Sequence, residues 1–233
     1  MTGGGLRALA CASLLFCALG IRSTVRAATA ALAGMAHPAS KDEPPTVAQH
    51  DDAPPDWAPR VSGYLYLTPD GDYLQPTFAA DHEWLHMEVR YNYEDRSTVS
   101  TWMGYNFSAG KKITLEITPM YGTVIGDTDG MALGYEGTLA WRWLELYSES
   151  EYLFALRGRS DSFLYTWTTL TASPADWLRV GAVVQRTQAY ETSLDIQRGF
   201  LVGLSTEHAG VTAYVINPDL HRPTYVLALD VSW

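Results

Sequence analysis

Apolar and polar side chains alternate with a period of two along most of the chain from Val61 to its last residue. The final stretch, PTYVLALDVSW, places Tyr225, Leu227 and Trp233 on one face and the residues between them on the other. This period is typical of β-strands, because successive side chains of a strand point to opposite sides. No helical period is sustained after Val61. The pattern therefore predicts an all-β fold.

Turn-forming segments rich in Gly, Pro and Asp divide this region into twelve expected strands. The clearest are PDGD, EDRS, GDTDG, RGRSD and HAG, whose residues favour tight turns. Ten strands is the alternative, since the first hairpin is the least regular. Pro76 and Pro119 lie inside expected strands and predict local irregularities, because proline has no backbone N–H. The expected strands are 61–68, 72–79, 83–94, 97–107, 111–125, 130–140, 143–156, 161–172, 176–189, 195–207, 210–217 and 223–233.

Alternation alone does not say which face looks outward. A soluble β-sandwich or barrel buries its apolar face, whereas a membrane barrel turns that face to lipid. In the stretch 83–94 the polar face carries His86, Glu88 and Arg90. Such a mixture suits a wet barrel interior, with His86 as a hydrogen-bonding residue, and it suits a soluble surface nearly as well. A soluble secreted β-barrel therefore remains an alternative at this point.

The positions of the tryptophans favour the membrane. If both termini lie on one side of an up-and-down barrel, every second connection lies there too. Six of the eight tryptophans then gather at that rim, and Trp57 is one of them. Tryptophan favours the membrane–water interface, because its ring is apolar while its N–H still needs a partner. The predicted interface residues within the barrel are Trp84, Trp141, Trp143, Trp177 and Trp233.

The final strand, with Tyr225 and a terminal Trp233, resembles the C-terminal signature of bacterial outer-membrane β-barrels, which normally ends in Phe. The segments GYNFSAGKKITLEITPMYG (104–122) and WLRVGAVVQRTQAYETSLDIQRG (177–199) also resemble uncharacterised small barrels of that class. The resemblance implies a closed antiparallel up-and-down transmembrane β-barrel in the outer membrane of a Gram-negative-type bacterium. It further implies two partners: membrane lipid, and the barrel assembly machinery, which reads the last strand. It brings no catalytic residues.

The N-terminal part has a different composition. Residues 6–21 (LRALACASLLFCALGI) form an apolar run that begins near Arg7 and leads into small residues, as in a secretory signal. We expect residues 1–27 to be a signal peptide, with cleavage between 27 and 33. Residues 28–60 are rich in proline and poor in aliphatic side chains, so we expect a disordered periplasmic linker. The barrel is then expected over 61–233.

The formal charge argues against nucleic acid as a partner. The full chain carries −10, and loss of the three arginines in residues 1–27 would change this to −13. Nucleic acids bind to basic patches rather than to acidic surfaces. The sequence does not indicate an oligomeric state.

The face opposite the apolar stripe supplies charged candidates for the barrel interior, with more acids than arginines. In one interpretation, Arg–Glu pairs fill and plug the barrel. In the other, surplus carboxylates line a narrow porin-like passage for cations or small polar solutes, as acidic rings do in channels. The candidates are Glu88, Arg90, Glu94, Glu116, Glu136, Arg142, Glu145, Glu149, Glu151, Arg157 and Arg179.

We expect no enzymatic activity, no metal site and no cofactor. A barrel enzyme acting on lipid or peptide, the alternative, needs a nucleophile and base at the outer rim. Only His221 among the six histidines falls there, and no G-x-S-x-G motif occurs. Glu145, Glu149 and Glu151 could suggest a metal site, but no His or Cys stands at ligand spacing. An arginine-paired or solvated acidic stripe is the preferred interpretation. No nucleotide-binding glycine motif follows an expected strand.

Overall fold

The computed structural model describes residues 57–69, 71–157, 162–189 and 194–233. The predicted signal peptide and most of the predicted linker lie outside these residues. Within the part of the chain that the structure describes, no helix combines the length and hydropathy needed to cross a membrane.

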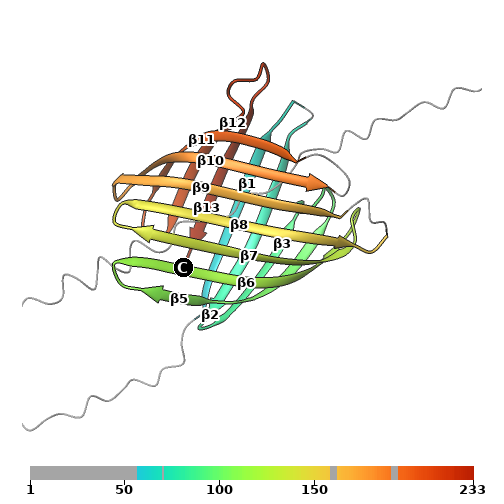
Figure 1. Ribbon diagram of the computed structural model, residues 1–233, viewed down its shortest axis with the longest axis horizontal. Helices are drawn as coiled ribbons and strands as arrows, with labels where there is room; N and C mark the ends of the chain where they lie inside the picture. The colour runs from blue at the N-terminus through green and yellow to red at the C-terminus, as the bar shows by residue number, and fades with distance from the viewer. Residues whose placement is uncertain (1–56, 70, 158–161, 190–193) are drawn as a thin grey trace, which may run out of the picture.

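The described chain is all β and wraps into a cylinder (Figure 1). Each strand follows a stretch of period-two alternation in the sequence, and each predicted strand is present. The first strand begins at Ala58, three residues before the predicted start of the barrel. The strands are β1 (Ala58–Leu67), β2 (Tyr73–His82), β3 (Leu85–Tyr91), β4 (Val99–Tyr105), β5 (Phe107–Gly110), β6 (Ile113–Ile125), β7 (Gly130–Trp141), β8 (Leu144–Ala155), β9 (Phe163–Ala175), β10 (Leu178–Ala189), β11 (Asp195–Ser205), β12 (Ala209–Ile216) and β13 (Thr224–Ser232).

The sheet closes on itself, so every strand except the short β5, which pairs only with β6, has a partner on both sides. Neighbouring strands pair antiparallel in the order β4-β3-β2-β1-β13-β12-β11-β10-β9-β8-β7-β6-β5, and β4 also pairs with β6. The last strand is held by the first, from Arg60 opposite Ser232 to Leu67 opposite Tyr225. With β4 and β5 counted as one interrupted strand, the predicted fold class, a closed antiparallel barrel of twelve strands, is confirmed. Closure leaves no bare edge on the other strands, which lipid would penalise.

The interruption between β4 and β5 lies opposite Pro119. Gly104 pairs with Met120 and Phe107 pairs with Ile117, so the register against β6 is the same on both sides of the break. Pro119 has no N–H to donate across this gap, while on the other side of the strand the N–H of Asn106 bonds to the carbonyl of Trp84, at 2.7 Å, and continues the pairing with β3. The predicted irregularity at Pro119 is therefore present. Pro76 likewise has no partner in β3, because the pairing of β2 with β3 begins at Thr77.

The two rims of the barrel differ in the length of their connections. At the rim that holds the chain ends, neighbouring strands are joined by residues 83–84, 111–112, 142–143, 176–177 and 206–208. Glu83 and Arg142 open two of these turns with positive φ angles of 52° and 57°, as tight hairpin turns require. The connections at the other rim are longer and include residues 92–98 and 217–223. We call the first rim the inner rim and the second the outer rim.

The outer surface of the cylinder is apolar. Large hydrophobic side chains such as Leu133, Leu170 and Phe200 are more than half exposed, and similar residues cover the outward face of every long strand. A water-soluble protein rarely exposes so large a continuous apolar surface. A closed sheet with an apolar exterior is instead the arrangement that spans a bilayer.

The tryptophans divide into two groups. Trp102 and Trp167 are buried inside the barrel. The six others are about half exposed or more, and they lie in or beside the inner-rim turns and the chain ends, which is the position that an interfacial aromatic girdle requires. These six are Trp57, Trp84, Trp141, Trp143, Trp177 and Trp233.

Candidate functional site

The barrel interior collects the polar face of each strand. In β3, for example, His86, Glu88 and Arg90 are buried while Met87 and Val89 are exposed. Alternation thus turns a charged stripe of the sequence inward, where side chains from opposite walls of the barrel meet. This interior is the candidate functional site.

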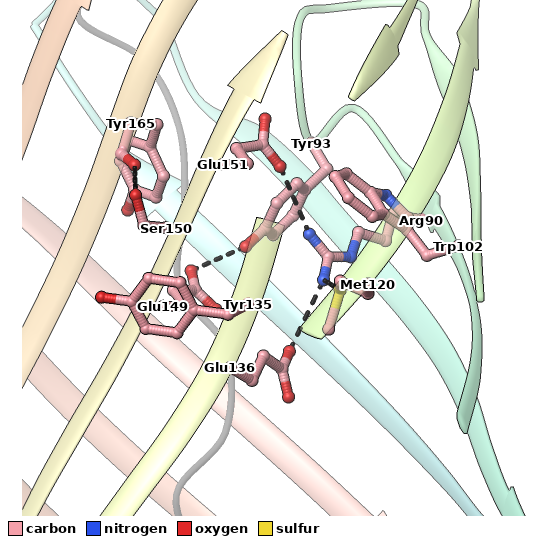
Figure 2. Close-up of a pocket in the computed structure, with 10 residues that line it drawn as sticks. All are labelled: Arg90, Tyr93, Trp102, Met120, Tyr135, Glu136, Glu149, Ser150, Glu151 and Tyr165. Atoms are coloured by element: carbon pink, nitrogen blue, oxygen red, sulfur yellow. Dashed lines mark hydrogen bonds and ion pairs between the residues drawn. The ribbon is translucent and has the colours of Figure 1, made fainter. Parts of the chain in front are cut away.

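Arg90 lies at the centre of this interior (Figure 2). Its Nε donates to Glu88 Oε2 at 2.5 Å, Nη2 lies 3.5 Å from Glu136 Oε1, and Nη1 lies 3.6 Å from Glu151 Oε2. These carboxylates come from β3, β7 and β8, so a single side chain links three strands. Arg90 is 3% exposed. A buried arginine needs this many partners, because removing its charge from water is costly.

Aromatic rings complete the surroundings of Arg90. Its guanidinium carbon lies 4.2 Å from the ring centroid of Tyr93 and 4.8 Å from that of Trp102, close enough for cation–π attraction. Nη2 also lies 3.7 Å from the sulfur of Met120. Tyr93 belongs to the connection after β3, so this outer connection sends a side chain into the barrel. The guanidinium is therefore enclosed by rings as well as by carboxylates.

A second arginine, Arg60 of β1, joins the same carboxylates from the other side. Its guanidinium nitrogens lie 3.5 Å from Glu88, 3.8 Å from Glu136 and 3.7 Å from Asp81. Sequence reasoning missed Arg60, because its position was assigned to the end of the linker. The only signal for it was its place one residue before the alternating stretch that starts at Val61.

His86 connects two of these acids. Its Nδ1 lies 2.7 Å from Asp81 Oδ1, and its Nε2 lies 3.3 Å from Glu88 Oε1. We call the assembly the central ion-pair network. Its members are Arg60, Asp81, His86, Glu88, Arg90, Glu136 and Glu151.

Three members of the network lie close enough together to hold a metal ion. The ligand atoms of His86, Glu88 and Glu136 are all within 4.8 Å of one another, and no other such group occurs among the described residues. However, Arg60 and Arg90 both already pair with Glu88 and Glu136. Two positive guanidinium groups at the same carboxylates oppose the entry of a metal cation. The geometry fits an ion-pair network better than a metal centre.

Buried aromatic side chains fill the barrel beyond this network. Tyr66 and Tyr73 stack with ring centroids 4.7 Å apart, and Trp167 meets Tyr214 edge to face at 5.5 Å. We call this group the aromatic layer. Together with the ion-pair network it closes the interior of the described conformation. Its members are Tyr64, Tyr66, Tyr73, Tyr93, Tyr147, Tyr165, Trp167 and Tyr214.

Glu149 joins the aromatic layer to the acidic face of β8. The hydroxyl of Tyr93 donates to Glu149 Oε1 at 2.7 Å, and that of Tyr147 donates to Oε2 at 2.8 Å. Glu94, in the connection after β3, accepts a 3.1 Å hydrogen bond from the indole N–H of Trp102. Both carboxylates are buried.

The interior is more open toward the inner rim. Glu145 is paired with Arg179 at 3.9 Å, and Arg179 also donates to the hydroxyl of Thr212 at 3.1 Å. Glu116 faces the same space from β6 and is exposed even though it lies on the inward face of its strand. We call these four residues the inner vestibule. Glu116 is exposed and Arg179 is partly exposed, so water reaches these two side chains, whereas Glu145 and Thr212 are buried.

Nine of the eleven charged residues expected in the interior are placed there. Glu94 reaches it from a connection rather than from a strand, because its loop turns inward. Whether these residues line a passage stays a prediction. The nine are Glu88, Arg90, Glu94, Glu116, Glu136, Glu145, Glu149, Glu151 and Arg179.

The expectation is wrong for Arg142 and Arg157. Arg142 is exposed in the two-residue turn after β7, where its positive φ ends the alternation, and its guanidinium lies over the ring of Trp141. Arg157 lies beyond the end of β8 in an outer connection, exposed and paired with Asp129 at 2.6 Å. The alternation of inward and outward side chains ends at the last paired residue of a strand. Both predictions are wrong because they continue this alternation beyond that residue.

The acidic stripe of β8 does not converge on one point. Glu145 pairs with Arg179, Glu149 accepts two tyrosine hydroxyls, and Glu151 faces Arg90. The preferred interpretation of these three acids, a stripe with arginine partners, fits Glu145 and Glu151.

His221, the candidate base of the alternative barrel enzyme, lies at the outer rim. His221 is exposed in the connection between β12 and β13. In the same connection, Asp219 accepts a 3.0 Å hydrogen bond from Arg198 of β11, and this bond lowers the pKa of the Asp219 carboxyl. His221 therefore lies in an exposed surface connection that a hydrogen bond links to the neighbouring strand β11.

Of the comparisons with known proteins, the one with solved structures bears on the fold. No protein-family model matches the sequence, and no curated protein matches it. Among solved structures, KdgM porin is similar with a TM-score of 0.56 at 12% identity, over 75% of this chain and 99% of that chain. KdgM porin in complex with disordered oligogalacturonate gives 0.55 at 11% identity, with the same coverage. Omp33 of Acinetobacter baumannii gives 0.47 at 13% identity, over 78% of this chain and 100% of that chain.

At such low identities the likeness concerns the fold alone. It agrees with the closed antiparallel sheet. The chain has the fold of a bacterial outer-membrane β-barrel, structurally similar to KdgM porin at low sequence identity.

Proposed function

We propose that this protein is a narrow porin-like passage of the outer membrane that favours cations and small neutral polar solutes over anions. The observation that carries the proposal is the charge of the interior. Among the described residues, eight carboxylates face it against three arginines, and a fourth arginine, Arg96 of an outer connection, lies over the ring of buried Tyr73. The acids are Asp81, Glu88, Glu94, Glu116, Glu136, Glu145, Glu149 and Glu151, and the arginines are Arg60, Arg90 and Arg179.

The sign of this charge sets the expected selectivity. Carboxylates around a narrow path lower the energy of a cation and raise that of an anion, more strongly than in bulk water because the walls have a low dielectric. A KdgM porin structure holds oligogalacturonate, a chain of acidic sugars. The acidic interior of the present barrel would repel such a polyanion, so the proposal does not extend that ligand to this chain.

The described conformation is a closed one. Arg90 and the aromatic layer are buried inside the barrel, and in the inner vestibule water reaches Glu116 and Arg179. Passage therefore requires these side chains to rearrange. A permanently filled structural barrel, whose role would reside in its outer connections, is the second candidate, and the burial of Arg90 among carboxylates is the observation that favours it.

Recordings of the purified protein in planar bilayers separate these two candidates. The passage predicts small discrete current steps, and a reversal potential in a KCl gradient that has the sign of cation selectivity. A filled barrel predicts silence. Anion-selective steps would contradict the proposed interior. Turnover of lipid or peptide substrates, abolished by His221→Ala, would instead support an enzyme.

Neutralising the inner vestibule tests the role of its acids. Glu116→Gln and Glu145→Gln together are expected to lower the cation-to-anion permeability ratio by about twofold to threefold at low salt, because charges in the wall of a passage act on ions over roughly one Debye length. Asp127→Asn, in an outer connection away from the interior, is the matched control and should leave the ratio unchanged. Equal effects of both changes would mean that the inner carboxylates do not set the selectivity.

A further inference from the structure

The interior already encloses one organic cation, the guanidinium group of Arg90. This group lies over the rings of Tyr93 and Trp102, at 4.2 and 4.8 Å, and faces carboxylates on its other sides. Aromatic rings combined with carboxylates are the surroundings that bind ammonium and guanidinium ligands in other proteins. The cage is thus chemically suited to cations of this class, and Arg90 occupies it as a tethered one.

The acids around this cage exceed what Arg90 can neutralise. Glu151 is 4% exposed and lines the same pocket as Arg90 (Figure 2). Among the residues that the structure describes, neither carboxylate oxygen of Glu151 has a hydrogen-bond partner, and its ion pair with Arg90 is a long one at 3.6 Å. Oε2 of Glu94 likewise has no such partner within the described chain. Buried carboxylates in this condition are costly and favour the uptake of positive charge.

The arrangement fits an organic cation better than a metal ion. Within the described residues, Glu149 and Glu151 belong to no set of three ligands close enough for one ion. The pocket that both line is bordered instead by buried aromatic residues, among them Tyr93 and Tyr165. A flat or elongated cation can contact separated carboxylates and ring faces at once, which a small metal ion cannot.

We propose that the pocket beside Arg90 binds small organic cations that carry a guanidinium or primary ammonium group, and that these enter by displacing the Arg90 side chain. If the proposed passage exists, these cations are the class of solute that it carries. Transport of the cations thus rests on the proposed function. Binding itself requires no conduction. Glu151 and the rings of Tyr93 and Trp102 are the groups that recognise the ligand.

The test uses Arg90→Ala, which empties the cage. Guanidinium chloride is titrated into the purified variant in detergent micelles, and fluorescence and thermal stability are followed, with urea as the uncharged ligand of the same shape. We expect saturable binding of guanidinium with a midpoint of about 1 to 10 mM and no saturable response to urea. The wild-type protein should bind at least about tenfold more weakly, because tethered Arg90 competes at high effective concentration.

Two further variants assign the binding to the pocket. Adding Glu151→Gln to Arg90→Ala should weaken guanidinium binding by about tenfold or more, since a charge-assisted contact is lost. Adding Asp127→Asn instead, which removes a surface acid, should not change it. Should Arg90→Ala not refold, Arg90→Gln, which keeps a polar side chain that is shorter and uncharged, is titrated in its place.

The proposal is overturned if the folded variant shows no saturable guanidinium response, if urea binds equally, or if Glu151→Gln has no effect. Binding in micelles together with silent bilayers would overturn the passage and leave this site standing. Cation-selective steps without guanidinium binding would overturn this site and leave the passage standing.

Discussion

Replacing Arg90 with alanine is expected to raise the ionic conductance of the barrel by at least about threefold and to lower its free energy of unfolding by about 3 to 5 kcal/mol. The guanidinium closes the middle of the interior by contacts with Glu88, Glu136 and Glu151 from three strands. Its removal opens space, leaves Glu151 without its ion-pair partner, and leaves Glu88 and Glu136 with one guanidinium partner fewer. Bilayer recording measures the first effect, and urea unfolding in lipid vesicles measures the second.

Arg142→Ala is the matched control, because Arg142 is an exposed arginine in an inner-rim turn. It should leave both quantities near their wild-type values. If Arg90→Ala conducts and unfolds as the wild type does, Arg90 is neither the barrier nor a principal support of the interior.

The second large effect concerns the outward face. Leu170 lies in the middle of β9 and is 55% exposed, whereas Leu220 lies in an outer connection and is 57% exposed. Leu170→Arg is expected to destabilise the barrel by about 2 to 4 kcal/mol, because it places a charge in the hydrocarbon layer. Leu220→Arg should change the stability by less than about 0.5 kcal/mol, as ordinary surface substitutions do. Reversible unfolding in vesicles gives both values.

This pair of variants distinguishes a lipid environment from water, because the exposed fractions of the two leucine side chains are nearly equal. A soluble barrel would show similar small effects at both positions. Equal stabilities of the two variants would therefore contradict a lipid-facing surface on β9.

The strands and their two faces could be predicted from the sequence, because alternation is a local property. The stretch that contains His86, Glu88 and Arg90 shows its inward face directly in the order of its residues. The break opposite Pro119 was also predictable, since a missing N–H acts at one known position. The rim position of Trp84 followed from counting connections.

The partners across the barrel could not be predicted in this way. Arg60 meets Glu136 because strands far apart in the sequence bring their inward faces to one height, and that height depends on the stagger of the closed sheet. Tyr93 reaches Glu149 because an outer connection turns inward. The period-two alternation of the strands does not predict the path of a connection. Arg142 and Arg157 were misplaced for a related reason, since both lie just beyond the end of a strand.

The assignment of inward and outward faces underlies the whole account, and adjacent residues on paired strands test it most directly. Leu115 of β6 pairs with Leu139 of β7 on the outward face, and their neighbours Glu116 and Thr138 pair on the inward face. Each of the four is replaced by cysteine in a chain whose two native cysteines are changed to serine, and then spin-labelled in bilayers. Labels at the leucine positions should collide with lipid-dissolved oxygen, and labels at Glu116 and Thr138 with a water-soluble nickel complex. The reverse pattern, or four labels that all collide with nickel, would contradict the account.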